Sequence, residues 1–308
     1  MQKITINDKK YPKSLLKIDN PPKQVYVEGN IELLNKNCIA IIGSRTCSEN
    51  GKKLAQKFAI ELSNQGIIII SGMAKGIDSE AHKGTLRAKG KTIAVLGSGL
   101  NNIFPKENTN LYKEILENKG LIISEYKPNI EPCSSRFLER NRIVSGLSIG
   151  VLVVEAGHRS GTSVTASLAQ KQGKKVFVIP HEINDKHGVG TNRLIRKGAI
   201  LITKTKEIID EFEFLKYKEI QEYETKINEK IKAKIKFENK EQECIYNILN
   251  NSGSEKIISI NDICQKIPMP INKINENLLI LEINQYIQKI NGGYICINNM
   301  NEVLMEKI

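Results

Sequence analysis

Four loops rich in glycine and small hydroxyl side chains follow apolar runs of the sequence, a composition suited to binding phosphate. They lie at residues 43–45, 71–78, 97–99 and 155–162. Parallel α/β sheets bind ligands at the carboxyl ends of their strands, and backbone N–H groups at the following helix starts attract anions. Because the loops are expected at one sheet edge, the sequence predicts a surface for an anion, and for an extended one.

Two cations accompany the first two loops, and both are candidate phosphate ligands. Arg45 directly follows the first apolar run, where its guanidinium could bind a phosphate through two hydrogen bonds. Lys75 lies in a turn flanked by glycines. An ordinary surface ion pair is the alternative for Arg45. These loops contribute the first candidate residues for anion binding, which are Gly43, Ser44, Arg45, Gly72 and Lys75.

A later seven-residue segment concentrates arginines around one aromatic side chain. It contains Arg136, Phe137, Arg140, Asn141 and Arg142. Cations neutralise a nucleic-acid backbone, and an aromatic ring stacks on an unpaired base. The alternative interpretation is a solvated helix face, with Phe137 packed in the core.

The last loop adds a third group of candidates. Ser160, Gly161 and Thr162 precede an apolar helical segment, and Glu155 ends the strand before them. A hydroxyl in this position usually caps the helix, but on the ligand edge it would also face a bound phosphate. Asn192, with arginines beside it, could extend the same basic rim.

Familiar nucleotide-binding and metal-binding patterns are absent from the sequence. It has no G-x-x-x-x-G-K-[ST] loop, and residues 43–46 lack the G-x-G-x-x-G fingerprint of NAD and FAD sites. The histidines and acids at 181–187 have no metal-ligand spacing. Asp78 is interpreted as a helix cap and His82 as a packed side chain. We therefore expect no catalytic residue, metal or cofactor.

An alternation of buried strands and amphipathic helices must position these loops. Apolar runs predict parallel strands buried on both faces, at residues 38–42, 67–70, 92–96, 121–124, 150–154, 175–179 and 199–202. Helical periodicity predicts helices between them, at residues 51–64, 79–88, 110–118 and 162–172. The expected fold class is α/β, an extended Rossmann-like, doubly wound and mostly parallel sheet.

The chain divides into five expected segments. These are a short N-terminal extension (1–37), the Rossmann-like domain (38–212), a charged linker (213–240), a small C-terminal winged-helix domain (241–298) and a tail (299–308). The winged-helix prediction rests on three helical segments followed by a hairpin.

The net charge of +12 indicates a polyanionic partner. Residues 1–212 hold 33 Lys and Arg against 20 Asp and Glu, whereas residues 241–308 hold 5 against 8. A coding bias toward lysine would raise the lysine content everywhere, so the excess in the first part predicts a basic surface there. The acidic C-terminal part is a poor candidate for DNA binding.

The six cysteines are scattered without a C-x-x-C pair, which predicts reduced thiols rather than a zinc or redox motif. No apolar run approaches the roughly 20 residues that cross a bilayer. The N-terminus lacks the apolar core of a signal peptide. The sequence therefore predicts a cytoplasmic protein with no membrane partner.

In order and combination, these motifs resemble those of the DprA (also called Smf) family of DNA-processing proteins. The resemblance covers about residues 11–212, with a weaker winged-helix match at 241–298. The segments that carry it are IAIIGSR at 39–45, SGMAKGID at 71–78, AH at 81–82, RNR at 140–142, VVEA through SGT at 153–162 and NRLIRKGA at 192–199.

The resemblance implies a protein that binds single-stranded DNA and loads the RecA recombinase onto it, in DNA recombination and natural transformation (competence). It also implies a homodimer without enzymatic activity, and it places the first and last loops at phosphates. By motif position it makes five side chains candidates for DNA contact: Arg45, Lys75, Phe137, Arg140 and Asn192.

Two other functions compete with this one. Phosphoribohydrolases of the lysine-decarboxylase-like group use a similar edge with a Gly-Gly-x-Gly-Thr-x-x-Glu loop, but here Thr165 stands where the catalytic glutamate would be. A transcription regulator would read DNA through the helical segment at 270–284, where Lys273 is outweighed by Glu276 and Glu282. That balance disfavours phosphate attraction, so we expect the C-terminal domain to serve protein contacts or regulation.

Overall fold

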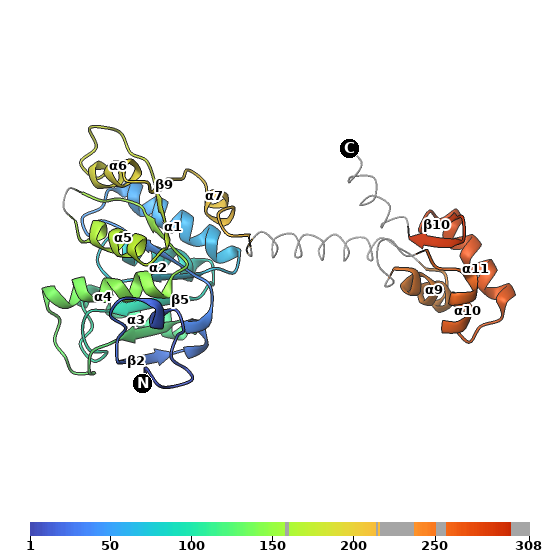
Figure 1. Ribbon diagram of the computed structural model, residues 1–308, viewed down its shortest axis with the longest axis horizontal. Helices are drawn as coiled ribbons and strands as arrows, with labels where there is room; N and C mark the ends of the chain where they lie inside the picture. The colour runs from blue at the N-terminus through green and yellow to red at the C-terminus, as the bar shows by residue number, and fades with distance from the viewer. Residues whose placement is uncertain (158–159, 214, 216–236, 251–256, 297–308) are drawn as a thin grey trace. The chain divides into compact units, whose positions relative to one another are not determined.

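The computed structural model describes residues 1–157, 160–213, 215, 237–250 and 257–296. The chain forms two compact units, residues 1–219 and 220–308 (Figure 1). Each unit has a hydrophobic core of its own. Within the described residues, no helix is long and apolar enough to cross a membrane.

The first unit is built on a nine-stranded sheet with the order β1-β2-β6-β5-β4-β3-β7-β8-β9. Its strands are β1 (Gln2–Thr5), β2 (Gln24–Gly29), β3 (Cys38–Ile42), β4 (Ile68–Ser71), β5 (Thr92–Leu96), β6 (Leu121–Ser124), β7 (Gly150–Val153), β8 (Lys175–Val178) and β9 (Ile200–Leu201). The strands from β3 to β9 run parallel, whereas β1 and β2 add antiparallel pairs beyond β6.

Helices cover both faces of this sheet (Figure 1). They are α1 (Glu49–Asn64), α2 (Ile77–Arg87), α3 (Thr109–Glu117), α4 (Ser134–Leu147), α5 (Gly161–Lys171), α6 (Val189–Arg196) and α7 (Thr205–Ile209). Successive residues of β3 serve opposite faces: Ile39 and Ile41 pack with α1, while Ala40 and Ile42 join the core beneath α4 and α5. Strands buried on both faces explain the continuous apolar runs, and the doubly wound, Rossmann-like α/β prediction is confirmed.

The sheet grows in two directions from its centre. The chain adds β4, β5 and β6 on one side of β3, and then returns to add β7, β8 and β9 on the other. The loops that leave β3 and β7 therefore diverge at the carboxyl edge. Open α/β sheets bind ligands in the crevice that such a switch in strand order creates.

Residues 1–37 are part of this sheet rather than an extension from it. β2 pairs with β6 and β1 pairs with β2, and Ile4, Val25 and Val27 are buried in the main core. The sequence gave no sign of β1, because four residues with one buried side chain carry too little periodicity.

The described part of the C-terminal unit contains three helices followed by a two-stranded hairpin. They are α9 (Lys240–Asn250), α10 (Ile260–Lys266), α11 (Ile271–Ile283), β10 (Ile287–Ile290) and β11 (Gly293–Cys296). Ile245, Ile263 and Leu278 are among the residues of their shared core. Most of the predicted linker at 213–240, and all of the predicted tail at 299–308, lie outside the described residues.

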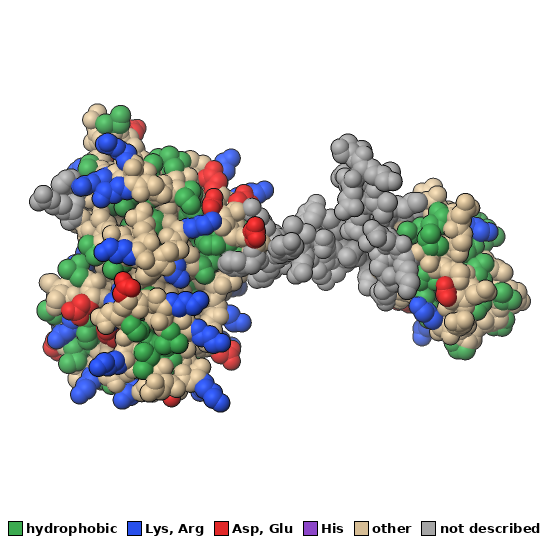
Figure 2. Space-filling view, viewed as in Figure 1, with side chains coloured by type: hydrophobic (Ala, Val, Ile, Leu, Met, Phe, Trp, Pro, Cys, Tyr) green, Lys and Arg blue, Asp and Glu red, His purple; other side chains and the backbone are tan. Residues whose placement is uncertain are grey.

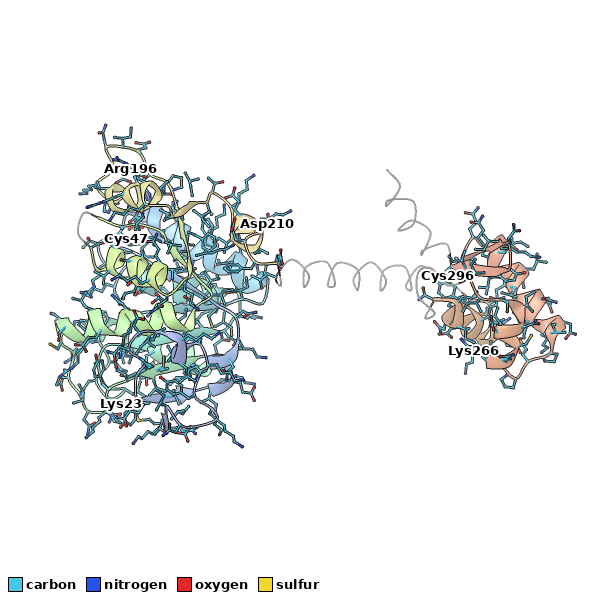
Figure 3. The ribbon with its side chains drawn as sticks, in the orientation of Figure 1. Lys23, Cys47, Arg196, Asp210, Lys266 and Cys296 are labelled. Atoms are coloured by element: carbon cyan, nitrogen blue, oxygen red, sulfur yellow. The ribbon has the colours of Figure 1, made fainter. Side chains whose placement is uncertain are left out.

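All six cysteines are free thiols, as the sequence predicts. Cys47 belongs to the first unit and Cys296 to the second (Figure 3). Among the described residues, no group of three or more His, Cys, Asp and Glu side chains is arranged to hold a metal ion.

Candidate nucleic-acid interface

A cavity of about 550 Å³ opens at the carboxyl edge of the sheet, and we call it the edge cavity. Its walls come from the loops after β3 and β4, from α4 and from the start of α5. The structure brings most of the sequence candidates to this one place: Gly43, Ser44, Arg45, Gly72, Phe137, Arg140, Asn141, Ser160, Gly161 and Thr162. The switch in strand order thus positions loops that are more than a hundred residues apart in the chain.

One wall of the edge cavity is aromatic and carries a cation. The Phe104 and Phe137 rings are stacked, with centroids 5.3 Å apart and planes inclined by 30°. The Arg45 guanidinium carbon lies 5.5 Å from the Phe137 centroid. Phe104 is 42% exposed although it is a large apolar side chain. Sequence reasoning missed Phe104, whose only signal was an aromatic next to proline shortly after a glycine-rich loop.

The third glycine loop supports this wall. A Cβ on Gly97 would lie 2.5 Å from the Phe137 Cδ1 atom, so Phe137 packs directly against the Gly97 backbone. Gly97 is absent from the cavity lining. A glycine here is required because any side chain would displace the ring.

Arg140 lines the edge cavity from beneath and is almost fully buried, since only 4% of the residue is exposed. Its Nη1 donates to the backbone carbonyls of Gly72, at 2.5 Å, and of Val95. The side chain therefore fastens α4 to the ends of β4 and β5. Burial lowers the pKa of Arg140 to about 10, which leaves the group charged at neutral pH.

The buried charge of Arg140 is balanced by a neighbouring carboxylate. Asp78 accepts a hydrogen bond from the Gly72 N–H at 3.1 Å and is almost fully buried. Burial raises the pKa of Asp78, and the nearby charge of Arg140 partly offsets that rise. Asp78 is not the helix cap that the sequence predicts: the cap of α2 is Gly76, whose φ of +79° suits glycine.

His82 is the packed histidine that the sequence predicts. It is fully buried, and its Nδ1 lies 2.7 Å from the Thr92 hydroxyl. Burial lowers the pKa of His82 to about 3. The ring is therefore neutral at physiological pH and belongs to the packing of α2 on β5.

Three sequence candidates do not line the edge cavity. Lys75 borders a smaller adjoining cavity of about 130 Å³ and forms an exposed ion pair with Glu107, with Nζ 2.5 Å from Oε1. Arg142 binds both carboxylate oxygens of Glu125, at 2.7 and 2.6 Å. Arg142 follows Arg140 by two helical positions, about 200° around α4, and so faces another way.

Asn192 is the third of these residues. Its amide accepts from the His181 N–H at 3.2 Å and donates to the His181 carbonyl at 2.9 Å. These bonds tie α6 to the loop after β8. The contacts in the structure therefore assign Asn192 a structural task in this loop, and its contact with DNA stays a prediction.

The start of α5 faces the edge cavity. Ser160 caps this helix by accepting a hydrogen bond from the Ser163 N–H, and Gly161 and Thr162 form its first turn. A helix N-terminus carries a partial positive charge that favours anions. Thr165 also lines the cavity and donates to the Gly161 carbonyl at 3.3 Å.

Lys and Arg side chains are spread over the face of the first unit shown in Figure 2. Residues 1–212 contain 33 Lys and Arg and 20 Asp and Glu. The excess of positive charge in this part of the chain favours an anionic ligand.

The chain matches a family model described as DNA recombination-mediator protein A over residues 2–213. It is 36% identical over 285 residues to Protein Smf of Escherichia coli (strain K12), covering 92% of this chain and 74% of that protein. It is 42% identical over 211 residues to DNA processing protein DprA of Streptococcus pneumoniae, covering 68% and 74%.

Solved structures show the same likeness. The X-ray structure of DprA from Streptococcus pneumoniae superimposes with a TM-score of 0.66 at 41% identity, over 69% of this chain and 74% of that one. DNA processing protein A from Helicobacter pylori, described for its single-stranded DNA binding mode, superimposes with a TM-score of 0.62 at 35% identity, over 68% and 95%. This chain therefore belongs to the DNA recombination-mediator protein A family.

Proposed function

We propose that this protein binds single-stranded DNA at the edge cavity and delivers the strand to the RecA recombinase during recombination, including the uptake of transforming DNA. The family description names a recombination mediator, and the Helicobacter pylori relative is described for binding single-stranded DNA. Both points support the resemblance on which the sequence prediction rests.

The single observation that carries the proposal is the Arg45–Phe137–Phe104 stack at the cavity wall. A guanidinium binds phosphate through several hydrogen bonds, and exposed aromatic rings stack on bases irrespective of their sequence. A single strand offers both groups at once, whereas a duplex hides its base faces. The helix start at Ser160 supplies backbone N–H groups for a neighbouring phosphate.

Binding without chemistry fits the side chains that line the cavity. The carboxylate among them is Asp78, which is engaged by the Gly72 N–H and buried beside Arg140. Thr165 stands at the position where a phosphoribohydrolase would carry glutamate. We expect no release of free base from nucleoside monophosphates, and release at an enzymatic rate would establish the hydrolase instead.

We also propose that the protein acts as a homodimer through the surface around α6 and β9. Leu201 is 48% exposed and Val189 39% exposed, although both are large and apolar. Pairing two copies there would bring two edge cavities together on one strand. Light scattering is expected to show a dimer that Leu201→Glu converts to a monomer, and an unchanged mass would refute this interface.

The C-terminal unit, which we interpret as a winged helix, is proposed to contact a protein rather than DNA. Ile271, Leu279 and Ile283 of α11 are exposed. Residues 241–308 carry 5 Lys and Arg against 8 Asp and Glu. Such a surface attracts phosphate poorly.

Fluorescence anisotropy with single- and double-stranded oligonucleotides across a salt series tests the binding proposal. We expect a preference for the single strand. Arg45→Ala is expected to weaken binding roughly tenfold, as for one lost hydrogen bond to a charged group, and to lower the salt slope by about one. Lys113→Ala, an exposed lysine on α3 outside the cavity lining, is the matched control. Equal binding of both DNA forms, or equal loss in both variants, would refute the site.

RecA delivery is tested separately. RecA filament formation on a strand already coated with single-strand binding protein is expected to accelerate when the wild-type chain is added. Arg45→Ala should not support this acceleration. Tight strand binding without any acceleration would limit the function to DNA binding.

A further inference from the structure

Glu155 is a fully buried carboxylate at the carboxyl end of β7, and the proposed DNA contacts do not use it. The preceding residue, Val154, donates its N–H to the carbonyl of Ile42 at the end of β3, at 3.0 Å. Glu155 therefore lies where the two central strands release their loops. One loop leads to Arg45 and the other to Ser160, and both of these residues line the edge cavity.

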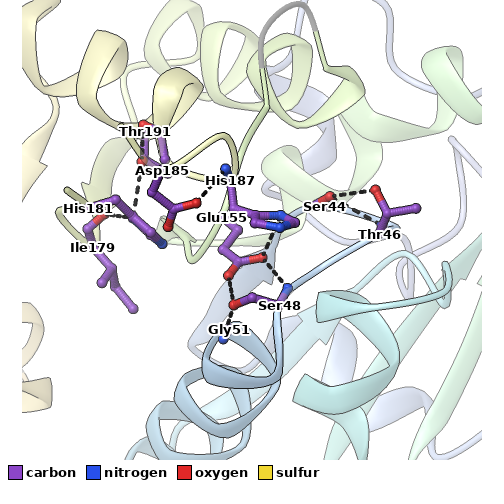
Figure 4. Close-up of polar contacts among 11 residues, drawn as sticks. Ser44, Thr46, Ser48, Gly51, Glu155, Ile179, His181, Asp185, His187 and Thr191 are labelled. Carbon is purple, nitrogen blue, oxygen red and sulfur yellow. Dashed lines mark hydrogen bonds and ion pairs between the residues drawn. The ribbon is translucent and has the colours of Figure 1, made fainter. Parts of the chain in front are cut away.

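The carboxylate binds the start of α1. Ser48 donates its backbone N–H to Oε2 at 3.0 Å and its hydroxyl to Oε1 at 2.5 Å (Figure 4). Ser48 also caps α1, because its hydroxyl oxygen accepts the Gly51 N–H at 2.9 Å. Glu155 thus fastens the loop after β3 at the point where that loop becomes a helix.

The first turn of α1 is shaped around this carboxylate. A Cβ on Gly51 would lie 2.3 Å from the Glu155 Oε1 atom. Since the neighbouring atoms leave no space for any side chain at this position, the glycine is needed for the carboxylate to reach Ser48.

The loop before α6, which carries His187, also contacts the end of β7 at Glu155 and Ala156. The His187 Nδ1 lies 3.8 Å from the Glu155 Oε2 atom, and the His187 carbonyl accepts the Ala156 N–H at 3.0 Å (Figure 4). The Gly190 N–H then donates to the Ala156 carbonyl at 2.7 Å. The loop before α6 is therefore joined to the end of β7 together with the loop after β3.

We propose that Glu155 is a positioning residue for DNA binding, which holds the Arg45 and Ser160 rims of the edge cavity at a fixed separation by fastening Ser48 and the His187 loop to the end of β7. This inference rests on the proposed DNA binding. A negative charge near an anion site repels phosphate, so a buried carboxylate at this place has to act through position rather than through attraction.

The starts of α1 and α5 differ in whether they could bind a phosphate. The carboxylate accepts the N–H and the hydroxyl of Ser48, the cap of α1, so an acidic group already lies at this helix end. Within the described residues, no carboxylate is hydrogen-bonded to the start of α5, which lines the cavity. A bound phosphate would therefore meet α5 rather than α1.

The test compares Glu155→Gln, Ser48→Ala and Ser48→Thr with a control on the other end of the same helix. Glu61, in the last turn of α1, accepts a hydrogen bond from the Thr205 hydroxyl and is outside the cavity lining. Glu61→Gln therefore makes the same carboxylate-to-amide change on α1 without touching the proposed positioning contacts. Single-strand affinity and amide hydrogen exchange are measured for each variant.

We expect Glu155→Gln to weaken single-strand binding roughly tenfold, the size of one lost hydrogen bond to a charged group, while the salt slope stays unchanged. Amide exchange at residues 43–51 should rise in the absence of DNA, with exchange at residues 60–64 unchanged. Ser48→Ala should weaken binding and Ser48→Thr should recover most of it. Glu61→Gln should keep wild-type affinity.

Tighter binding by Glu155→Gln would show that the carboxylate acts as a repelling charge and would overturn the proposal. Unchanged affinity with unchanged exchange would also overturn it. If Glu155→Gln does not fold, the Ser48 variants decide: equal single-strand affinity of Ser48→Ala and Ser48→Thr would overturn the proposal. If the wild type binds no single strand, the proposed function fails, whereas the exchange at residues 43–51 still decides whether Glu155 holds this loop.

Discussion

The two units of the chain bury polar groups in different ways. The α/β unit buries charged and imidazole side chains, namely Asp78, His82, Arg140 and Glu155. In the described part of the C-terminal unit, the buried polar side chains are the amides of Gln242 and Asn277, and the rest of the core is apolar. Both units reach a packed core, but only the first places charge inside it.

This difference agrees with a binding site in the α/β unit. Moving a charge out of water costs free energy, and an apolar side chain would fill the same space without that cost. In the α/β unit, Arg140 and Glu155 each join separate loops at the carboxyl edge of the sheet. These buried charges hold the loops of the proposed binding surface in place. The described part of the C-terminal unit has no buried charged side chain with such a role.

The largest expected effect is on the stability of the α/β unit. Arg140→Ala leaves Asp78 buried without its balancing charge and removes the donors to Gly72 and Val95. We expect a loss of about 3–5 kcal/mol in the free energy of unfolding of this unit. Calorimetry should show its transition lowered while that of the C-terminal unit stays in place. The control is Arg136→Ala, which removes a half-buried arginine of the same helix that donates to the Glu131 carbonyl. An equal loss in both variants would contradict the comparison.

The next largest effect is on single-strand affinity, and it compares one substitution in each unit. Phe137→Ala removes the ring between Arg45 and Phe104 and is expected to cost about 1–3 kcal/mol of single-strand binding, the value of one stacked base. Leu279→Ala removes an exposed apolar side chain of α11 in the C-terminal unit and should leave affinity unchanged. Anisotropy titration measures both, and a loss in Leu279→Ala would show that the acidic unit also contacts the strand.

The two units should also differ in how much stability they lose as the pH falls. The pKa of His82 falls from 6.5 to about 3 on burial, so the unfolded chain binds the proton more readily. The α/β unit should therefore lose about 1.4 kcal/mol per pH unit as the pH falls from 6.5 toward 3. The raised pKa of Asp78 acts in the opposite direction, so the comparison is made with His82→Leu.

Denaturant titrations at several pH values should show a shallower acid slope in His82→Leu than in the wild type. The C-terminal unit contains no histidine and lacks this loss. Parallel slopes in the wild type and the variant would show that His82 is not buried as a neutral ring.

The smallest expected effect is that of removing the C-terminal unit, residues 220–308. The remaining chain keeps the sheet, the edge cavity and the basic surface, so its single-strand affinity should equal that of the full chain. Anisotropy with both proteins checks this, and abolished affinity would place part of the DNA site in the C-terminal unit.

Much of the α/β unit could be predicted from local pattern. The strands at Cys38–Ile42, Thr92–Leu96 and Leu121–Ser124 lie where continuous apolar runs predict them. The loop chemistry after β3 and before α5 predicted a common edge, because parallel strands end on the same side. β1 was missed because its one buried residue, Ile4, gives no periodicity.

The roles of individual cations were harder to predict. Arg140 and Arg142 look equivalent in sequence, yet one lies beneath the cavity and the other pairs with Glu125. Phe104 was missed because its stacking on Phe137 joins the loop after β5 to helix α4. Such contacts have no signature within a short window of sequence.

The sequence by itself therefore determined the alternation of elements, the basic character of the first unit and the loops that gather at one edge. These properties follow from composition and periodicity, which act over a few residues. Only the tertiary structure decided which arginine is buried, which aromatic completes the wall, and that Glu155 reaches Ser48 across 107 residues of chain. Burial and charge pairing depend on which elements pack together, and that is a property of the whole sheet.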